Sequence, residues 1–177
     1  MKYLQDKAFI DAILMAWPYF AAGGNQAGKR MTGKFNIAEL FTYRLHVLKK
    51  QTDRTMSDAF EAALSLSLTE ARLLLSVGAF GSLSVSDLGR VSNLDRSQAS
   101  RATDVLERKG LLVKTSNEAD ARGVLVALTA QGRSTYRRAA TISKATNDAI
   151  LATLSEHERE VLATVLAKLV ASTEEGE

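Results

Sequence analysis

The spacing of apolar residues predicts helices along most of the chain. From position 35 to about position 63 they recur every three or four residues, and no glycine or proline interrupts them, which is typical of a long amphipathic helix. This apolar face is longer than one small domain needs, so we expect part of it to pack against a partner chain. The face comprises Ile37, Leu40, Phe41, Leu45, Leu48, Thr52, Met56, Ala59 and Ala63.

Capping residues mark the starts of further helices. A serine or aspartate followed three positions later by Glu, Asp or Gln can satisfy the free backbone N–H groups at a helix start. Such pairs predict helices that begin near residues 67, 84, 95 and 155, and Thr129 predicts one more start. The pairs are Ser67–Glu70, Ser84–Asp87, Asp95–Gln98 and Ser155–Glu158.

A winged helix-turn-helix is predicted within residues 67–128. Only a few residues separate the helix that begins at Ser84 from the helix that begins at Asp95, which is the spacing of a helix-turn-helix. Gly110 is a left-handed C-cap for the second helix, and the apolar runs 111–114 and 124–128 are typical of two short strands joined by a polar tip. The fold class expected is therefore mainly α with a small β wing.

Two more helices are predicted after the wing. The first runs from Thr129 to about Thr153, and the second begins after Ser155. The second helix carries an aliphatic stripe, which favours packing against a second copy of the chain because the central core is already supplied. The stripe comprises Val161, Leu162, Val165, Leu166, Leu169 and Val170.

The chain divides into three predicted segments. Residues 1–22 form a short amphipathic helical extension that ends near Pro18, and residues 23–34 form a glycine-rich, flexible linker. Residues 35–177 form the main domain. In that domain 35–64 and 129–173 are the predicted dimerisation helices and 67–128 the winged helix-turn-helix.

Composition argues against several kinds of site. The 177 residues include no cysteine, and His46 and His157 are far apart, so we expect no metal site and no cofactor. The chain has no glycine-rich phosphate loop, no H-E-x-x-H motif and no nucleophile elbow, so we do not expect an enzyme. The apolar run at 12–22 is too short to span a bilayer and is a poor signal-peptide core, so we expect a cytoplasmic protein without membrane contact.

Positive charge is concentrated around the predicted helix-turn-helix and wing. Residues 95–144 contain ten Lys or Arg and five Asp or Glu, whereas residues 145–177 contain two Lys or Arg and seven Asp or Glu. A polyanion such as double-stranded DNA would bind where the positive charge gathers. The alternative is that these charged side chains are simply solvated on the exposed faces of helices.

The expected base readers lie at the start of the helix that follows Asp95. The major groove admits a helix, and side chains near the N-terminus of that helix reach the base edges. Gln98 has an alternative role, because a capping box with Asp95 would use its side chain. The candidate readers are Ser97, Gln98, Ser100 and Arg101.

Cations elsewhere in this region are expected to contact the minor groove or the phosphate backbone. Arg122 at the wing tip suits the narrow minor groove of A·T-rich DNA. Asp120 would hold the Arg122 guanidinium in one orientation, because the two residues share a face of an extended tip. The cations that contact phosphate or are solvated are Arg96, Arg108, Lys109 and Lys114.

A winged-helix protein-interaction module without operator binding is the alternative function. Such a module would not need Arg101 and Arg122 together with a positive surround. The strength and salt dependence of binding to a polyanion would distinguish the two functions.

Several motifs in register resemble the MarR (multiple antibiotic resistance regulator) family of winged helix-turn-helix transcription factors. The family pattern D-R-S-x-x-[ST]-R appears at residues 95–101, L-E-x-K-G-L at 106–111, D-x-R at 120–122 and L-T-x-x-G at 128–132. The resemblance covers roughly residues 35–170. The chain departs from the family in Lys114, where arginine is usual, and in residues 1–34, which extend beyond the ordinary start.

The resemblance implies a fold of two helices, a strand, two helices, two strands and two helices. Its first helix and last two helices would interleave in a homodimer. It also implies a DNA-binding transcriptional regulator, specifically a repressor that a small molecule releases from a pseudo-palindromic operator.

The resemblance further implies an effector site in the crevice between the dimerisation helices and the winged helix-turn-helix. An arginine with aromatic neighbours suits a planar anion, such as an aromatic carboxylate or its thioester. The alternative is that Arg72 pairs with Glu61 or with solvent and that Tyr43 lines the dimer core. The candidate ligand residues are Trp17, Tyr43, His46 and Arg72.

Overall fold

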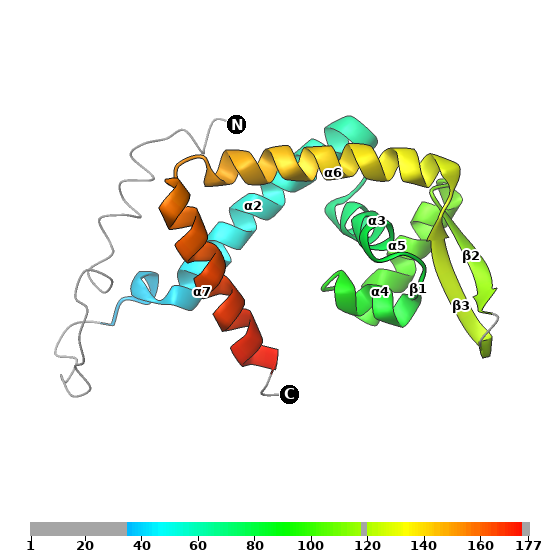
Figure 1. Ribbon diagram of the computed structural model, residues 1–177, viewed down its shortest axis with the longest axis horizontal. Helices are drawn as coiled ribbons and strands as arrows, with labels where there is room; N and C mark the ends of the chain where they lie inside the picture. Colours follow the sequence, from blue (N-terminus) through cyan, green and yellow to red (C-terminus); the bar gives the residue numbers. More distant parts are fainter. Residues whose placement is uncertain (1–34, 118–119, 175–177) are drawn as a thin grey trace. The chain divides into compact units, whose positions relative to one another are not determined.

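The computed structural model describes residues 35–117 and 120–174 (Figure 1). The predicted helical extension and linker at residues 1–34 lie outside the described residues. The chain divides into two units, Met1–Thr55 and Met56–Glu177, and helix α2 (Phe41–Leu64) crosses the boundary. Among the described residues no single helix is long and apolar enough to cross a membrane; α2 and the following helix α3 (Leu68–Phe80) reach that length and composition only as a bent pair.

The described part of the first unit corrects the predicted start of the long helix. A short 3-10 helix, η1 (Ile37–Glu39), precedes α2, and the two are separated by Leu40, whose backbone is extended. Asn36 causes the early turn, because its side chain accepts a hydrogen bond from the Ala38 N–H over 3.1 Å and so caps η1. The long helix therefore begins at Phe41 rather than at position 35.

Helix α3 begins after Ser67, where the sequence predicts a helix start. Ser67 Oγ accepts a hydrogen bond from the Glu70 N–H, and a Glu70 carboxylate oxygen accepts one from the Ser67 N–H, so the capping box is complete. Gly81 follows the last turn with a φ of 84°, a left-handed value that glycine adopts without a side-chain clash.

Helices α4 (Val85–Val91) and α5 (Arg96–Arg108) form the predicted helix-turn-helix. Ser84 caps α4 by accepting a hydrogen bond from the Asp87 N–H over 3.1 Å. Asn93 in the turn has a φ of 53°, which asparagine tolerates better than most residues, and the Leu94 N–H donates to the Gly89 carbonyl over 2.9 Å. This turn brings α5 back across α4, and both helices contact α3.

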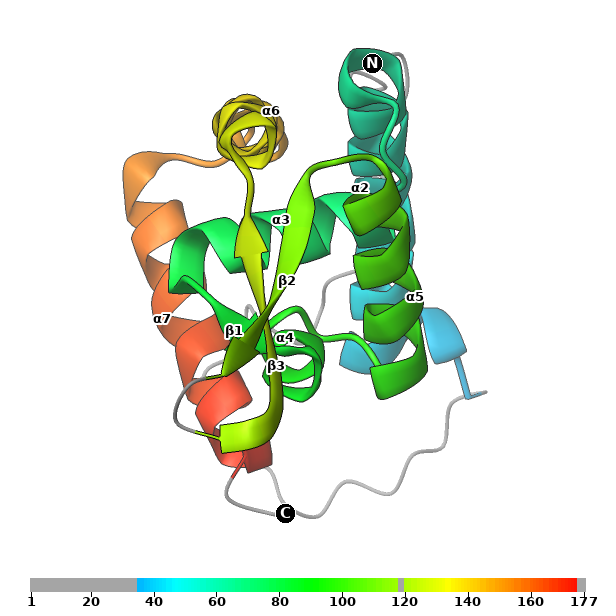
Figure 2. The same cartoon turned by 90° about the vertical axis from the view of Figure 1, so that its right-hand side faces the viewer.

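A three-stranded antiparallel sheet completes the winged helix-turn-helix. Its strands are β1 (Leu83–Ser84), β2 (Leu112–Asn117) and β3 (Asp120–Leu128), in the order β1-β3-β2. Lys114 pairs with Val126 across the β2–β3 hairpin, and the register shifts between Ser116 and Asn117. Figure 2 shows the hairpin in front of α3, with α5 beside β2. We call residues 67–128 the winged head.

Two helices follow the wing. Helix α6 (Ala130–Leu151) is capped by Thr129, whose Oγ1 accepts a hydrogen bond from the Gly132 N–H over 2.9 Å. Helix α7 (Glu156–Glu174) begins with the reciprocal hydrogen bonds of Ser155 and Glu158. Every residue from 155 to 172 is exposed, so the aliphatic stripe of α7 is uncovered in the single chain.

The hydrophobic core lies among α3, α4, α5 and the sheet. Phe60 from the last turns of α2 and Ala139 from α6 close the core, and both are fully buried. Each fully buried leucine or phenylalanine contributes about 1.5–3 kcal/mol to folding, so this core holds α5 and the hairpin in place. Its largest fully buried apolar side chains are Phe60, Leu66, Leu73, Leu74, Leu88, Leu106 and Val126.

Candidate nucleic-acid interface

The first turn of α5 is held by a capping box. The Gln98 N–H donates to Asp95 Oδ1 over 2.7 Å, and the Asp95 N–H donates to Gln98 Oε1 over 3.2 Å. The capping role that the sequence allowed for Gln98 is therefore present. The box uses only Oε1, so the two N–H donors on the Gln98 amide nitrogen lie outside it and can still meet a base edge.

Helix α5 has one buried face and one exposed face. Ala99, Ala102, Thr103 and Leu106 are buried, and the Thr103 hydroxyl donates to the Ala99 carbonyl over 2.8 Å, which satisfies it inside the core. The opposite face is polar and cationic near the helix start. Its exposed residues are Arg96, Ser97, Gln98, Ser100 and Arg101, the same residues that the sequence proposes as DNA contacts.

Arg101 is oriented by its neighbour one turn earlier. One of its terminal nitrogens donates a hydrogen bond to Ser97 Oγ. Arginine has five N–H donors, so four remain for a base or a phosphate. Arg101 and Gln98 also border a shallow depression of about 280 Å³ between α5 and the start of α3, where Ser67, Thr69 and Glu70 line the other side.

Lys114 on β2 makes two ion pairs with α5. Its Nζ lies 2.7 Å from Asp104 Oδ1 and 2.8 Å from Glu107 Oε2. Hydrogen bonds to Asp104 and Glu107 raise the pKa of Lys114, and the hydrogen bond and charge of Lys114 lower the pKa of Asp104. Neither acid was predicted from the sequence as a functional residue. The two acids lie three residues apart, so they share one face of α5, and the chain returns beside that face after Gly110. This spacing could have identified them.

Lys109 at the end of α5 connects the winged head to the end of α2. Its Nζ donates to the carbonyl oxygen of Ser65 and to Glu70 Oε2, each over 2.8 Å. Glu70 also completes the capping box of α3, so one carboxylate contacts both the start of α3 and the end of α5. Arg108 beside it is exposed. The phosphate contacts expected of Arg96, Arg108, Lys109 and Lys114 stay predictions.

The wing tip carries the predicted minor-groove contact. Asp120 and Arg122 belong to strand β3, but their side chains lie outside the described part of the structure. The role of Arg122, and its orientation by Asp120, stay predictions.

Comparison with known proteins agrees with this geometry. The profile of the MarR family matches residues 64–123, which include the whole helix-turn-helix and most of the wing. The uncharacterized HTH-type transcriptional regulator YdgJ of Bacillus subtilis (strain 168) is 32% identical over 110 residues, which are 62% of this chain and 67% of YdgJ. The chain belongs to the MarR family. It is a DNA-binding transcriptional regulator with a winged helix-turn-helix, as predicted, and the alternative of a protein-interaction module is not supported.

Solved structures of MarR-family proteins share the fold. Bordetella bronchiseptica BpsR, whose DNA binding is regulated by 6-hydroxynicotinic acid, has a TM-score of 0.71 at 20% identity, covering 78% of this chain and 98% of BpsR. A MarR variant from E. coli in complex with operator DNA has a TM-score of 0.65 at 22% identity, covering 72% of this chain and 91% of that protein.

The residues predicted to bind an effector of this MarR-family chain are divided between its two units. Tyr43 and His46 are exposed on α2 in the first unit, and Arg72 is half-buried on α3 in the second. Trp17 lies outside the described residues. An effector site formed by these four residues stays a prediction.

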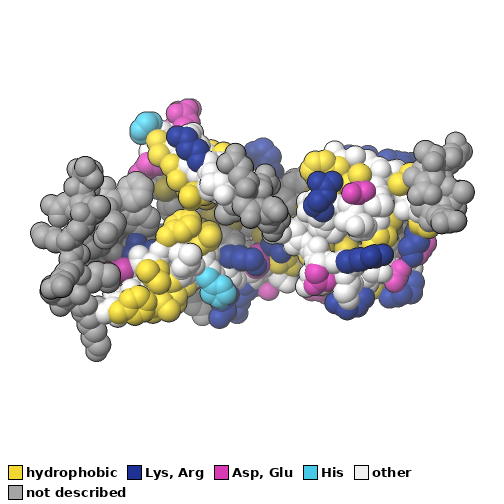
Figure 3. All heavy atoms as spheres, turned by 90° about the horizontal axis from the view of Figure 1, so that it is seen from below, with side chains coloured by type: hydrophobic (Ala, Val, Ile, Leu, Met, Phe, Trp, Pro, Cys, Tyr) yellow, Lys and Arg dark blue, Asp and Glu magenta, His cyan; other side chains and the backbone are white. Residues whose placement is uncertain are grey.

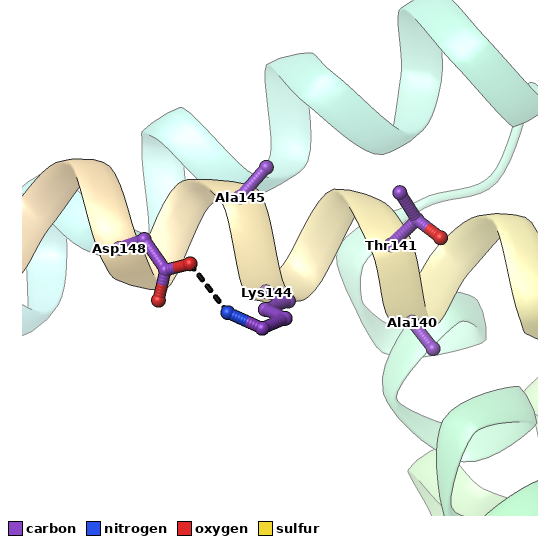
Figure 4. Close-up of a pocket in the computed structure, with 5 residues that line it drawn as sticks. All are labelled: Ala140, Thr141, Lys144, Ala145 and Asp148. Atoms are coloured by element: carbon purple, nitrogen blue, oxygen red, sulfur yellow. Dashed lines mark hydrogen bonds and ion pairs between the residues drawn. The ribbon is translucent and has the colours of Figure 1, made fainter.

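A separate depression lies on α6. It has a volume of about 410 Å³, and its described lining residues are Ala140, Thr141, Lys144, Ala145 and Asp148 (Figure 4). Lys144 Nζ donates to Asp148 Oδ2 over 2.6 Å along its edge. None of these lining residues belongs to the predicted effector set, so the depression adds no support for that set.

Proposed function

We propose that the protein is a homodimeric repressor whose two winged heads bind the halves of a pseudo-palindromic operator and whose affinity for DNA falls when a small aromatic acid binds. The observation that carries this proposal is the exposed, cationic first turn of α5, held in one geometry by its capping box. A helix presented in this way suits the major groove.

The roles of the α5 residues follow from their chemistry. Arg101 suits a guanine, because its guanidinium can donate two hydrogen bonds to O6 and N7, and such a pair discriminates against other bases by about 1–3 kcal/mol. Ser97 and Ser100 are short enough to let the helix approach the base edges. Arg96, the first residue of α5, suits the phosphate backbone at the edge of the groove.

Uncovered apolar surface supports the homodimer. Apolar side chains are exposed at the start of α2 and along α7, and Figure 3 shows patches of hydrophobic side chains on the surface. A surface of this kind marks an interface, and most soluble homo-oligomers are symmetric dimers. On α7 the exposed residues are Val161, Leu162, Val165, Leu166, Leu169 and Val170, each between 37% and 56% exposed.

Selection of binding sites from random double-stranded DNA tests the operator. We expect an inverted repeat whose half-site centres lie one helical turn apart, ~34 Å, because two symmetry-related helices must enter successive major grooves on one face. Arg101→Ala provides the matched control and should enrich a degenerate site. Enrichment of no site, or of an asymmetric site bound by one chain, would contradict the proposal.

A thermal-shift screen of small aromatic acids tests the effector. The wild-type protein and Arg72→Ala are screened in parallel, and each hit is then added to the operator complex. We expect hits that stabilise the wild type more than the variant and that weaken operator binding, since a ligand releases DNA only by binding the non-operator state more tightly. Equal stabilisation of both proteins would remove Arg72 from the site.

A further inference from the structure

The register of the β2–β3 hairpin determines which way Lys114 faces. Lys114 pairs with Val126, and directly paired residues of an antiparallel sheet point to the same face. Val126 is fully buried, so this face is the one that packs on the core and lies beside α5. Lys114 therefore meets α5 at Asp104 and Glu107, which lie one turn apart on that helix.

The positive charge of Lys114 is already neutralised within the protein. One ammonium group lies within 2.8 Å of two carboxylates, and the Lys114 side chain is 32% exposed. The carboxylates use two of the three N–H donors of Lys114. A phosphate group brought to the third donor would lie beside both acids, which would repel it.

We propose that Lys114 is a positioning residue, which holds the β2–β3 hairpin against α5 through Asp104 and Glu107 and does not itself contact DNA. This inference rests on the proposed function, in which α5 and the wing bind the same operator. The strand on which Lys114 lies leads to the wing tip, so its ion pairs fix the tip relative to the helix that reads the bases. This proposed role differs from the phosphate contact or solvation expected of Lys114 from the sequence.

Removing the two acids separates positioning from phosphate contact. If Lys114 contacts phosphate, Asp104→Ala/Glu107→Ala frees it and removes negative charge beside the DNA, so operator binding becomes equal or tighter. If Lys114 is a positioning residue, the same double variant weakens binding although it makes the protein more positive. Alanine is the best helix former, so these substitutions do not weaken α5 through helix propensity.

The position of the wing can be measured without DNA. The chain has no cysteine, so Thr115→Cys, on the neighbouring β2 residue that points to the opposite sheet face, accepts a single nitroxide spin label. We expect Lys114→Ala and Asp104→Ala/Glu107→Ala to increase the label's mobility, and Lys114→Arg to restore the wild-type spectrum, because arginine also pairs with carboxylates. An unchanged spectrum in both deletion variants would overturn the proposal.

Operator affinity is then measured against salt concentration for the same variants. We expect Lys114→Ala and the double variant each to weaken binding about 10-fold, within the range found for coupled neighbours. The slope of log K against log salt should stay at the wild-type value. The control is Asp58→Ala/Glu61→Ala, which makes the same change of charge at two exposed positions of α2. A slope that falls by about 0.9 for each lost contact in Lys114→Ala, with equal or tighter binding by the double variant, would overturn the proposal.

The two measurements distinguish the failure of this inference from the failure of the proposed function. If the wild-type protein selects no operator, the proposed function fails, and the spin-label spectra still decide whether Lys114 holds the hairpin. If the protein binds an operator but the spectra do not change, only the positioning role fails.

Discussion

Gly132 in the first turn of α6 lies against the carbonyl group of Leu111, so closely that a Cβ atom at position 132 would overlap the carbonyl oxygen. Thr129 maintains this approach: its hydroxyl donates to the Gly110 carbonyl over 2.7 Å and accepts from the Gly132 N–H. The junction joins the end of α5, the start of β2 and the start of α6. The L-T-x-x-G motif therefore allows the start of α6 to pack closely against the junction between α5 and β2.

Substitution of this glycine should destabilise the fold. We expect Gly132→Ala to lower the free energy of unfolding by about 1–3 kcal/mol, because the added methyl group forces the backbone apart and outweighs the gain in helix propensity. Urea unfolding measures the change. Ser134→Ala, exposed on the same helix, is the control and should stay within about 0.5 kcal/mol of wild type. A Gly132→Ala protein as stable as this control would contradict the close approach.

Arg101 and Arg122 should affect DNA binding in different ways. We expect Arg101→Ala to cost about 1–3 kcal/mol and to relax the base preference at one position in each half-site. Arg122→Ala should weaken binding and leave the preference at the central base pairs nearly unchanged, since the minor groove carries a degenerate pattern. Affinities for a panel of single-base operator variants test both. If the wing residue set the central preference, the assigned roles would be reversed.

The aliphatic stripe of α7 should determine the oligomeric state. We expect Leu166→Glu to convert a dimer into a monomer in sedimentation experiments at micromolar concentration, because a charge placed in an apolar interface loses its hydration. Lys168→Ala on the same helix is the control and should remain dimeric. A Leu166→Glu protein that sediments as a dimer would exclude this stripe from the interface.

The ion pair between Asp104 and Lys114 should be visible in the titration of Asp104. The pKa of Asp104 lies below its ordinary value of 3.8, mainly because Lys114 donates a hydrogen bond to it. Because the pKa of Asp104 is lower in the folded state than in the unfolded state, its ionised form stabilises the fold. This stabilisation is complete above the unfolded-state pKa and is lost as the pH falls through the folded-state pKa, which lies below 3.8.

Carbon-detected NMR titration of the side-chain carboxyl groups measures this shift. In Lys114→Met we expect the Asp104 midpoint to rise toward its ordinary value. Asp148, whose pKa is lowered by Lys144, is the internal control and should titrate as in the wild type. An Asp104 midpoint that does not move would place the Lys114 ammonium elsewhere in solution.

Helix starts and turns were predictable from the sequence because their causes are local. The capping boxes of Ser67 with Glu70 and of Asp95 with Gln98 join residues three apart, so the pattern of letters already specifies the hydrogen bonds. The left-handed Gly110 is equally local. The predicted start of the long helix was wrong because two local signals compete there. The apolar pattern extends from position 35, but the Asn36 side chain caps a short 3-10 helix, so α2 begins only at Phe41.

The partners of the cations were decided by the tertiary structure. The sequence shows a positive segment around α5 and the wing, but it does not show which charges are neutralised inside the protein. Lys109 meets Glu70 across 39 residues and Lys114 meets Asp104 across 10, because the strand register and the packing of α3 on α5 bring them together. Composition and spacing thus determined a DNA-binding winged helix. Only the tertiary structure distinguishes Arg96 and Arg101, whose side chains are exposed, from the cations that form ion pairs within the winged head. The reason is that an ion pair depends on the distance between two charges in space.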